Sequence, residues 1–193
     1  MIIKDWKREV FTIPNLLSLF RIALIPIYTH IYLHAAKLPD YYLAGGILAL
    51  SCITDLIDGK IARHFHMISK VGKVLDPVAD KLTQFTLTLC LSVHRPALRP
   101  VLTLFVIKES FQLVAMIANL RRGKALPGAL TAGKVCTTVL FVSLIAMVIF
   151  PDMNNRLSDL IALICGIFLC ISFFSYILAY FGKNTRIQDL DLE

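Results

Sequence analysis

Charged residues are scarce in this 193-residue chain, and the charges it does carry are unbalanced. Asp, Glu, Lys and Arg make up only 17% of the residues, apolar residues make up 57%, and 13 acids stand against 20 Lys and Arg. So little charge excludes an ordinary soluble domain and indicates a protein that lies in a bilayer. The basic excess is typical of loops that face anionic headgroups, so we expect membrane lipid as a partner and no nucleic acid.

Several familiar signatures are also missing. The sequence contains no glycine-rich nucleotide loop and no Ser-His-Asp signature. Its five cysteines include no C-x-x-C pair, and all of them fall within apolar segments. This pattern favours cysteines that serve as small buried side chains.

Long apolar runs separated by polar breaks fill most of the chain. A membrane-spanning helix needs about 20 largely apolar residues, which allows six spans here. The predicted spans are Ile13 to Ala35, Tyr42 to Ala62, Pro77 to Val93, Val101 to Leu120, Ala132 to Phe150 and Leu157 to Phe181. The fold class predicted is therefore an all-α, polytopic membrane protein with six transmembrane helices.

The two ends flank this membrane domain, which we place at residues 13–182. Residues 1–12 mix apolar and basic side chains around Trp6, which favours a short interfacial helix. Residues 183–193 form a polar tail. A signal peptide is disfavoured because the first apolar run is too long and is interrupted by Arg21 and Pro26.

The basic residues predict an orientation. Twelve Lys and Arg fall in the N-terminal segment, the second and fourth loops and the tail, against four in the remaining loops. By the positive-inside rule, both termini lie on the cytoplasmic side of the cell (inner) membrane. Four cations remain inside or beside the spans, where they should face carboxylates or a charged ligand. They are Arg21, Lys81, Lys108 and Lys134.

Four aspartates stand among these apolar segments at helical spacing. Asp55 and Asp58 are three residues apart, and Asp76 and Asp80 are four apart. Each pair therefore shares one face of its helix, and the two pairs can converge across a helical hairpin. Carboxylates persist in such surroundings only where cations, water or chemistry compensate them. Hard divalent cations such as Mg²⁺ prefer these oxygens, so the pattern predicts a metal site that can neutralise a diphosphate.

Small and basic residues accompany the aspartates. Gly59 and Ala62 follow the first pair and permit close approach of backbone or ligand, as does Gly72 before the second pair. Arg63 offers a planar donor fork to a phosphate.

These residues carry a resemblance. The sequence here reads Asp55-Leu56-Ile57-Asp58-Gly59-Lys60-Ile61-Ala62-Arg63, then eight residues, Gly72, three residues, Asp76, three residues and Asp80. It resembles the signature of the CDP-alcohol phosphatidyltransferase family at all eight fixed positions. Thr12 to Arg21, Gly133-Lys134 and Tyr176 to Arg186 look similar to members that make phosphatidylglycerophosphate or cardiolipin.

The resemblance implies a six-helix membrane enzyme that transfers the phosphatidyl group of CDP-diacylglycerol to an alcohol and releases CMP. It implies two divalent cations, Mg²⁺ or Mn²⁺, held by Asp55, Asp58, Asp76 and Asp80, with Asp80 as the catalytic base. The CDP-lipid would then be bound by Asp55, Gly59, Ala62, Arg63, Gly72 and Asn15. A homodimer is expected from the resemblance alone.

The acceptor alcohol stays open between two glycerol-type molecules. Glycerol 3-phosphate, placed narrowly first on family frequency, needs several cations, and Lys108, Lys134, Arg121 and Arg122 are the candidates, with Lys124. Phosphatidylglycerol, which would give cardiolipin, presents a neutral hydroxyl. It better tolerates Met116 and Cys136, where bacterial glycerophosphate-using members have Arg and Lys.

Two other interpretations compete. The aspartates can form an ion-paired network with the intramembrane cations, without turnover, and Glu109 is the expected local partner of Lys108. Charged intramembrane residues also suit a transporter, although no inverted repeat is evident. Lys134 suits an interfacial lysine as well as an acceptor site.

Overall fold

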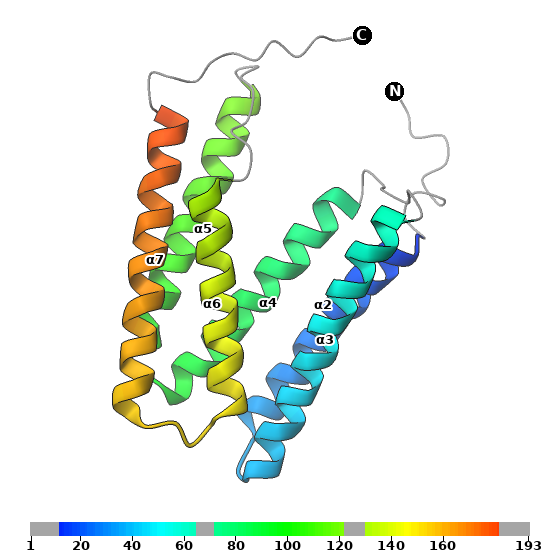
Figure 1. Cartoon of the computed structure of the whole chain (residues 1–193), viewed down its shortest axis with the longest axis vertical. Coiled ribbons are helices and arrows are strands. Elements are labelled where there is room, and N and C mark those ends of the chain that lie inside the picture. The colour runs from blue at the N-terminus through cyan, green and yellow to red at the C-terminus, as the bar shows by residue number, and fades with distance from the viewer. Residues whose placement is uncertain (1–11, 65–71, 122–129, 182–193) are drawn as a thin grey trace. The chain divides into compact units, whose positions relative to one another are not determined.

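The computed structural model describes residues 12–64, 72–121 and 130–181, with the side chains at 13, 14, 55–64, 73, 74, 120 and 181 left out. Within these ranges it contains six α-helices and no strand (Figure 1). They are α2 (Ile13–Leu33), α3 (Leu38–His64), α4 (Gly72–His94), α5 (Leu98–Arg121), α6 (Thr131–Ile149) and α7 (Asn155–Phe181). The all-helical prediction is confirmed for these residues, while the predicted interfacial helix and the tail lie outside them.

Helices α3 and α4 show the largest shifts from the predicted spans, both toward an earlier start. The structure starts α3 at Leu38 and α4 at Gly72, instead of at Tyr42 and Pro77. Hydropathy misses these first turns because they carry polar residues on helical backbone. In α4 the consequence is functional, since Asp76 and Asp80 both lie within the helix and their spacing of four places them on one face.

The start of α3 is fixed by Asp40 in its first turn. The Asp40 carboxylate accepts hydrogen bonds from the backbone N–H groups of Ala36 and Lys37, both at 3.0 Å. These two bonds hold the pKa of Asp40 below its usual value, because they favour the charged carboxylate. The loop that was expected between the first two spans is therefore short and capped.

Four helices of the described chain are long and apolar enough to cross a membrane. They cover Asn15–Leu33, Leu98–Asn119, Thr131–Ile149 and Asn155–Tyr180. Helices α3 and α4 are 27 and 23 residues long, which at 1.5 Å per residue is also sufficient length for a span. They carry the aspartates and their neighbouring cations, which lowers their mean hydropathy.

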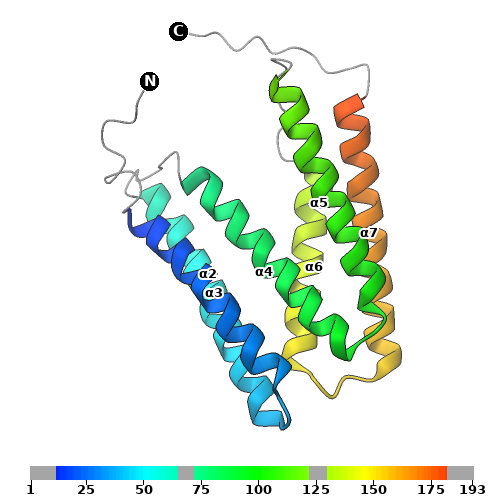
Figure 2. The same ribbon diagram turned by 180° about the vertical axis from the view of Figure 1, so that it is seen from behind.

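The chain divides into two compact units. The first comprises residues 1–90 and 145–152, and the second comprises residues 91–144 and 153–193. In the first unit, α2 and α3 lie side by side (Figures 1 and 2). Its buried side chains include Tyr28, Tyr32, Ala44, Leu48, Ala79 and Leu87.

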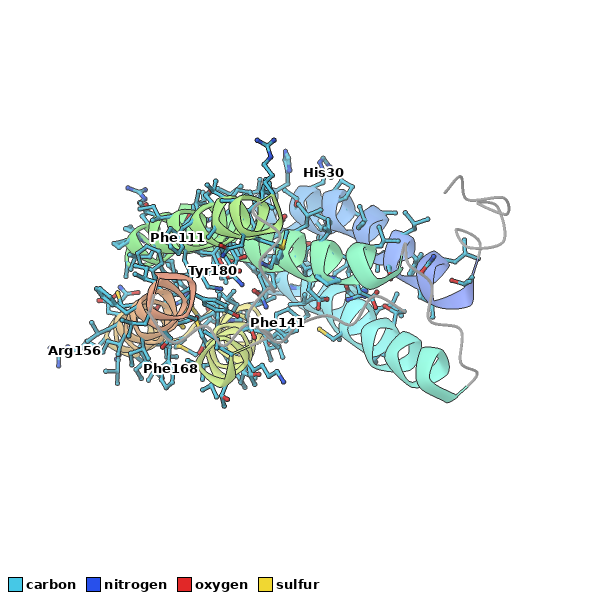
Figure 3. All side chains as sticks on the ribbon, turned by 90° about the horizontal axis from the view of Figure 1, so that it is seen from above. His30, Phe111, Phe141, Arg156, Phe168 and Tyr180 are labelled. Carbon is cyan, nitrogen blue, oxygen red and sulfur yellow. The ribbon has the colours of Figure 1, made fainter. Side chains whose placement is uncertain are left out.

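The second unit is built on α5 and α7, which also lie side by side. Its buried side chains include Leu98, Val101, Phe105, Leu140, Leu144 and Leu169. Phe111 of α5 and Tyr180 of α7, both labelled in Figure 3, meet edge to face with ring centres 6.5 Å apart. Phe173 contacts Phe111 in the same manner, at 5.2 Å. These aromatic contacts join the two helices.

Candidate functional site

The first half of α2 has a polar face, although most of the helix is apolar. Asn15, Ser18 and Arg21 recur every three residues, so they lie on the same side of the helix. All three are buried in the first unit. A buried arginine requires partners because an uncompensated cation away from water is costly.

The partners of Arg21 are the second pair of signature aspartates. Arg21 Nη1 donates to Asp80 Oδ1 at 2.5 Å, and Nη2 donates to Asp76 Oδ1 at 3.2 Å. The Ser18 hydroxyl also donates to Asp76 Oδ1. Two carboxylates one turn apart on α4 are therefore gathered by a single guanidinium from α2. This confirms that Arg21 faces the carboxylates.

Exposure differs sharply across this cluster. The side chain of Arg21 is 3% exposed, whereas those of Asp76 and Asp80 are 42% and 50% exposed. The carboxylates therefore remain within reach of ions and substrates, while their organising cation is buried. Carboxylate oxygens that ions can reach are the ligands a hard divalent cation prefers, so these two residues fit such an ion.

The other two aspartates can be placed only by their backbone. Asp55 and Asp58 lie in α3, three residues apart, and their side chains are outside the described set. Among the described side chains, no group of three or more His, Cys, Asp or Glu residues gathers as a metal site. The four-carboxylate cage with two cations thus stays a prediction.

The residues predicted to bind the CDP-lipid fall into two groups. Gly59, Ala62 and Arg63 lie near the end of α3, and the latter two have side chains that the structure does not describe. Gly72 is the first residue of α4 and is half-buried. Asn15 is almost fully buried, on the same face of α2 as Ser18. Their role in binding is a prediction.

The predicted acceptor residue Lys108 lies in the second unit as half of an ion pair. Its Nζ is 2.6 Å from Glu109 Oε1, and the two side chains are 5% and 14% exposed. The ammonium also lies 5.7 Å from the ring centre of Tyr176, a favourable cation–π position. The expectation that Glu109 is the local partner of Lys108 is confirmed.

Tyr176 is seated closely against α6. A Cβ added at Gly133 would lie 2.6 Å from the Tyr176 hydroxyl and 2.9 Å from its ring. Because glycine has no Cβ, Gly133 leaves room for the Tyr176 ring that lies over Lys108.

The remaining acceptor candidates have different surroundings. Arg121 is the last residue of α5 and is exposed, and Lys134 is exposed in the first turn of α6. Arg122 and Lys124 lie outside the described residues. Thus, of the three candidates that the structure describes, Lys108 is the buried one, and its charge is balanced by Glu109.

Sequence reasoning missed two members of these clusters. Ser18 contributes a hydroxyl to Asp76, and Tyr176 contributes its ring to Lys108. The spacing of Ser18, three residues before Arg21, was a usable signal. Tyr176 is 68 positions beyond Lys108 in the chain, so no local pattern pairs them.

Known proteins are similar to this chain over most of its length. The family described as CDP-alcohol phosphatidyltransferase matches residues 11–179. A Streptomyces coelicolor protein named cardiolipin synthase (CMP-forming) is 36% identical over 139 residues, covering 67% of this chain and 61% of the relative. A Schizosaccharomyces pombe protein named as a fusion of cardiolipin synthase (CMP-forming) and a mitochondrial hydrolase is 37% identical over 126 residues, covering 65% of this chain and 20% of the relative.

A third relative matches at lower identity but over more of both chains. The Bacillus subtilis protein named CDP-diacylglycerol--glycerol-3-phosphate 3-phosphatidyltransferase is 28% identical over 190 residues, covering 91% of this chain and 96% of the relative. The chain therefore spans less than two thirds of the two cardiolipin synthases described above and nearly the full length of this transferase.

Proposed function

The chain belongs to the CDP-alcohol phosphatidyltransferase family, and on that basis we propose that it transfers the phosphatidyl group of CDP-diacylglycerol to a glycerol-type acceptor, releasing CMP. The observation that carries the proposal is the pairing of Asp76 and Asp80 on one guanidinium. This pairing holds two of the four signature aspartates close together in the first turns of α4, with their side chains partly exposed.

Two divalent cations, Mg²⁺ or Mn²⁺, would be held by Asp55, Asp58, Asp76 and Asp80. When bound, they neutralise the diphosphate and stabilise the charge that develops on phosphorus and on CMP. The residues at the end of α3 would support the nucleotide end of the substrate, with Arg63 donating to the diphosphate. Gly59, Ala62 and Gly72 would allow its close approach, and Asn15 would border it.

Asp80 is the group we assign to proton transfer. The acceptor hydroxyl oxygen forms a bond to the phosphorus that carries diacylglycerol, the bond from that phosphorus to the CMP oxygen breaks, and Asp80 takes the hydroxyl proton. Half of the Asp80 side chain is exposed, so an acceptor can reach it. Arg21 restrains its Oδ1 atom, which limits rotation of the carboxylate.

We propose phosphatidylglycerol as the acceptor and cardiolipin as the product. Glycerol 3-phosphate brings nearly two phosphate charges and calls for several cations, but the buried Lys108 is already balanced by Glu109. The reacting end of phosphatidylglycerol is a neutral glycerol, which needs no such cluster. The 36–37% identity to proteins named cardiolipin synthase supports the same choice.

Glycerol 3-phosphate is the second candidate acceptor. The Bacillus subtilis relative whose name specifies it matches over 96% of its own length. The exposed Arg121 and Lys134 would then supply cations to the phosphate, with Arg122. This alternative keeps the same donor, metal site and leaving group.

The membrane arrangement follows from the same proposal. We assign residues 13–182 to one six-span membrane domain, in which α3 and α4 also cross the bilayer. Both termini and the aspartates would lie on the cytoplasmic side of the inner membrane, because the basic residues concentrate there. The interfacial N-terminal helix, the polar tail and a homodimer complete the proposed organisation.

The test supplies purified protein in detergent with CDP-diacylglycerol, Mg²⁺ and one acceptor at a time. We expect CMP and cardiolipin with phosphatidylglycerol, and little product with glycerol 3-phosphate. Formation of phosphatidylglycerophosphate instead would reverse the choice of acceptor while leaving the transfer chemistry intact. Absence of CMP with either acceptor would contradict the proposed function as a whole.

A further inference from the structure

We propose that Arg21 is a positioning residue that sets the Asp76 and Asp80 carboxylates for divalent-cation binding. The inference rests on the proposed function, because it concerns the same acidic site. Arg21 lies on α2, outside the acidic signature of α3 and α4. Helix α2 would thereby determine the geometry of a metal site whose ligands come from other helices.

The geometry of the guanidinium is the first argument. Its two terminal nitrogens reach two different carboxylates, Asp80 at 2.5 Å and Asp76 at 3.2 Å, each through Oδ1. A planar fork with fixed angles between its donors restrains both side chains together. Ser18, one turn earlier on α2, holds the same Asp76 oxygen. Both carboxylates therefore have their rotation set by α2.

The burial of the three side chains shows that Arg21 depends on the aspartates for charge compensation more than they depend on it. The aspartates are 42% and 50% exposed, so water can solvate their charge without an arginine. Arg21 is 3% exposed and requires the carboxylates to compensate its own desolvation. A buried arginine is thus a costly way to neutralise accessible acids. Its presence is explained if restraining their orientation has a function.

The anchoring of Arg21 also favours a fixed role. It lines a small cavity of about 20 Å³ within the first unit, together with Tyr28, Ser51 and Thr83. Its other lining residues are mostly apolar, among them Leu24, Ile47 and Leu87, so Arg21 is enclosed on its inner side and meets the carboxylates on the other. Such anchoring suits a residue that orients ligands from behind.

A contrasting role makes the opposite prediction. If the guanidinium instead occupied the place of a metal ion, its removal would free the carboxylates and tighten metal binding. Its charge also repels a nearby divalent cation, which acts in the same direction. The sign of the change in metal affinity therefore separates an organising Arg21 from a competing one.

The experiment measures Mn²⁺ binding by electron paramagnetic resonance on detergent-purified protein without the CDP-lipid. We expect Arg21→Gln to weaken Mn²⁺ binding by about 10-fold to 100-fold, as for other residues that orient metal ligands. Arg21→Lys should be intermediate, because an ammonium cannot span two carboxylates as the planar fork does. Ser18→Ala should cause a smaller loss. Arg156→Gln, which removes an exposed arginine from the second unit, is the matched control.

A second readout separates positioning from loss of structure. The Mn²⁺ concentration that half-saturates CMP release should rise in Arg21→Gln, and the rate should recover substantially at high Mn²⁺. Size-exclusion profiles identify a misfolded variant, in which case Arg21→Lys and Ser18→Ala carry the test. Unchanged or tighter Mn²⁺ binding in folded Arg21 variants would overturn the inference alone. Failure of the wild type to bind Mn²⁺ would overturn the proposed metal site and the inference together.

Discussion

The buried ion pair of the second unit provides a quantitative prediction. Lys108 and Glu109 are joined at 2.6 Å, and their side chains are 5% and 14% exposed. We consider Lys108→Met, which keeps a side chain of similar length and removes the charge. The change deprives Glu109 of this contact, while its carboxylate stays largely shielded from solvent.

The expected loss follows from the cost of breaking a buried pair. Removing one partner of such a pair costs about 3–5 kcal/mol, because the remaining buried charge loses the compensation that this partner gave. The lost cation–π contact with Tyr176 is part of that loss, contributing about 0.5–2 kcal/mol. For a chain of this size, about 1 kcal/mol corresponds to about 2–4 °C, so the melting temperature should fall by about 6–20 °C. Adding Glu109→Gln removes the remaining buried charge of the pair and should restore most of the stability.

Thermal unfolding of the purified variants in detergent measures these differences. Lys134→Met is the control, because Lys134 is exposed on α6 and its substitution should cost less than about 0.5 kcal/mol. The reasoning is refuted if Lys108→Met costs no more than this control. It is also refuted if the double variant is as unstable as Lys108→Met, since the loss would not then arise from the pair.

Two further predictions concern single positions in the helices. Gly133→Ala should lower unfolding free energy by about 1–3 kcal/mol, because the new Cβ would meet the Tyr176 hydroxyl at 2.6 Å; Gly166→Ala, with nothing within 4 Å, should not destabilise the protein in the same melting assay. At Asp40, the lowered pKa means that the capping contribution is fully present above the usual aspartate pKa of about 3.9 and is lost as the pH falls through the lower folded value. Wild type should therefore melt above Asp40→Ala at pH 7 and lose that advantage in acid, as the Asp40 carboxylate becomes protonated; a difference that persists once the carboxylate is protonated would contradict the capping role.

The succession of helices along the chain was largely predictable from the sequence, because apolar runs and polar breaks have a direct physical cause. The starts of α3 and α4 were not, since helical backbone there carries Asp40 and Asp76 instead of apolar residues. Capping at Asp40 depends on local hydrogen bonds that mean hydropathy does not register.

The candidate site was predictable in its residue types and less so in its contacts. The spacing of Asp76 and Asp80 placed both on one face, and the cost of an intramembrane cation predicted that Arg21 would face carboxylates. Two contacts were not predictable: the hydrogen bond from Ser18 to Asp76, and the binding of both aspartates by one Arg21 guanidinium. Both depend on how α2 packs against α4. Packing between helices distant in sequence leaves no periodic signal in a single chain.

The central claim is that signature aspartates of α3 and α4 carry metal-dependent phosphatidyl transfer, with Asp80 as the base. Release of CMP from CDP-diacylglycerol by wild type and by Asp80→Asn tests it most directly. Asp159→Asn, which neutralises an exposed acid of α7, is the control. We expect wild-type release to stop on chelation of divalent cations and to resume with Mg²⁺, and Asp80→Asn to lose about 10²-fold to 10⁴-fold in rate. Near wild-type release by Asp80→Asn, or release unaffected by chelation, would contradict the account.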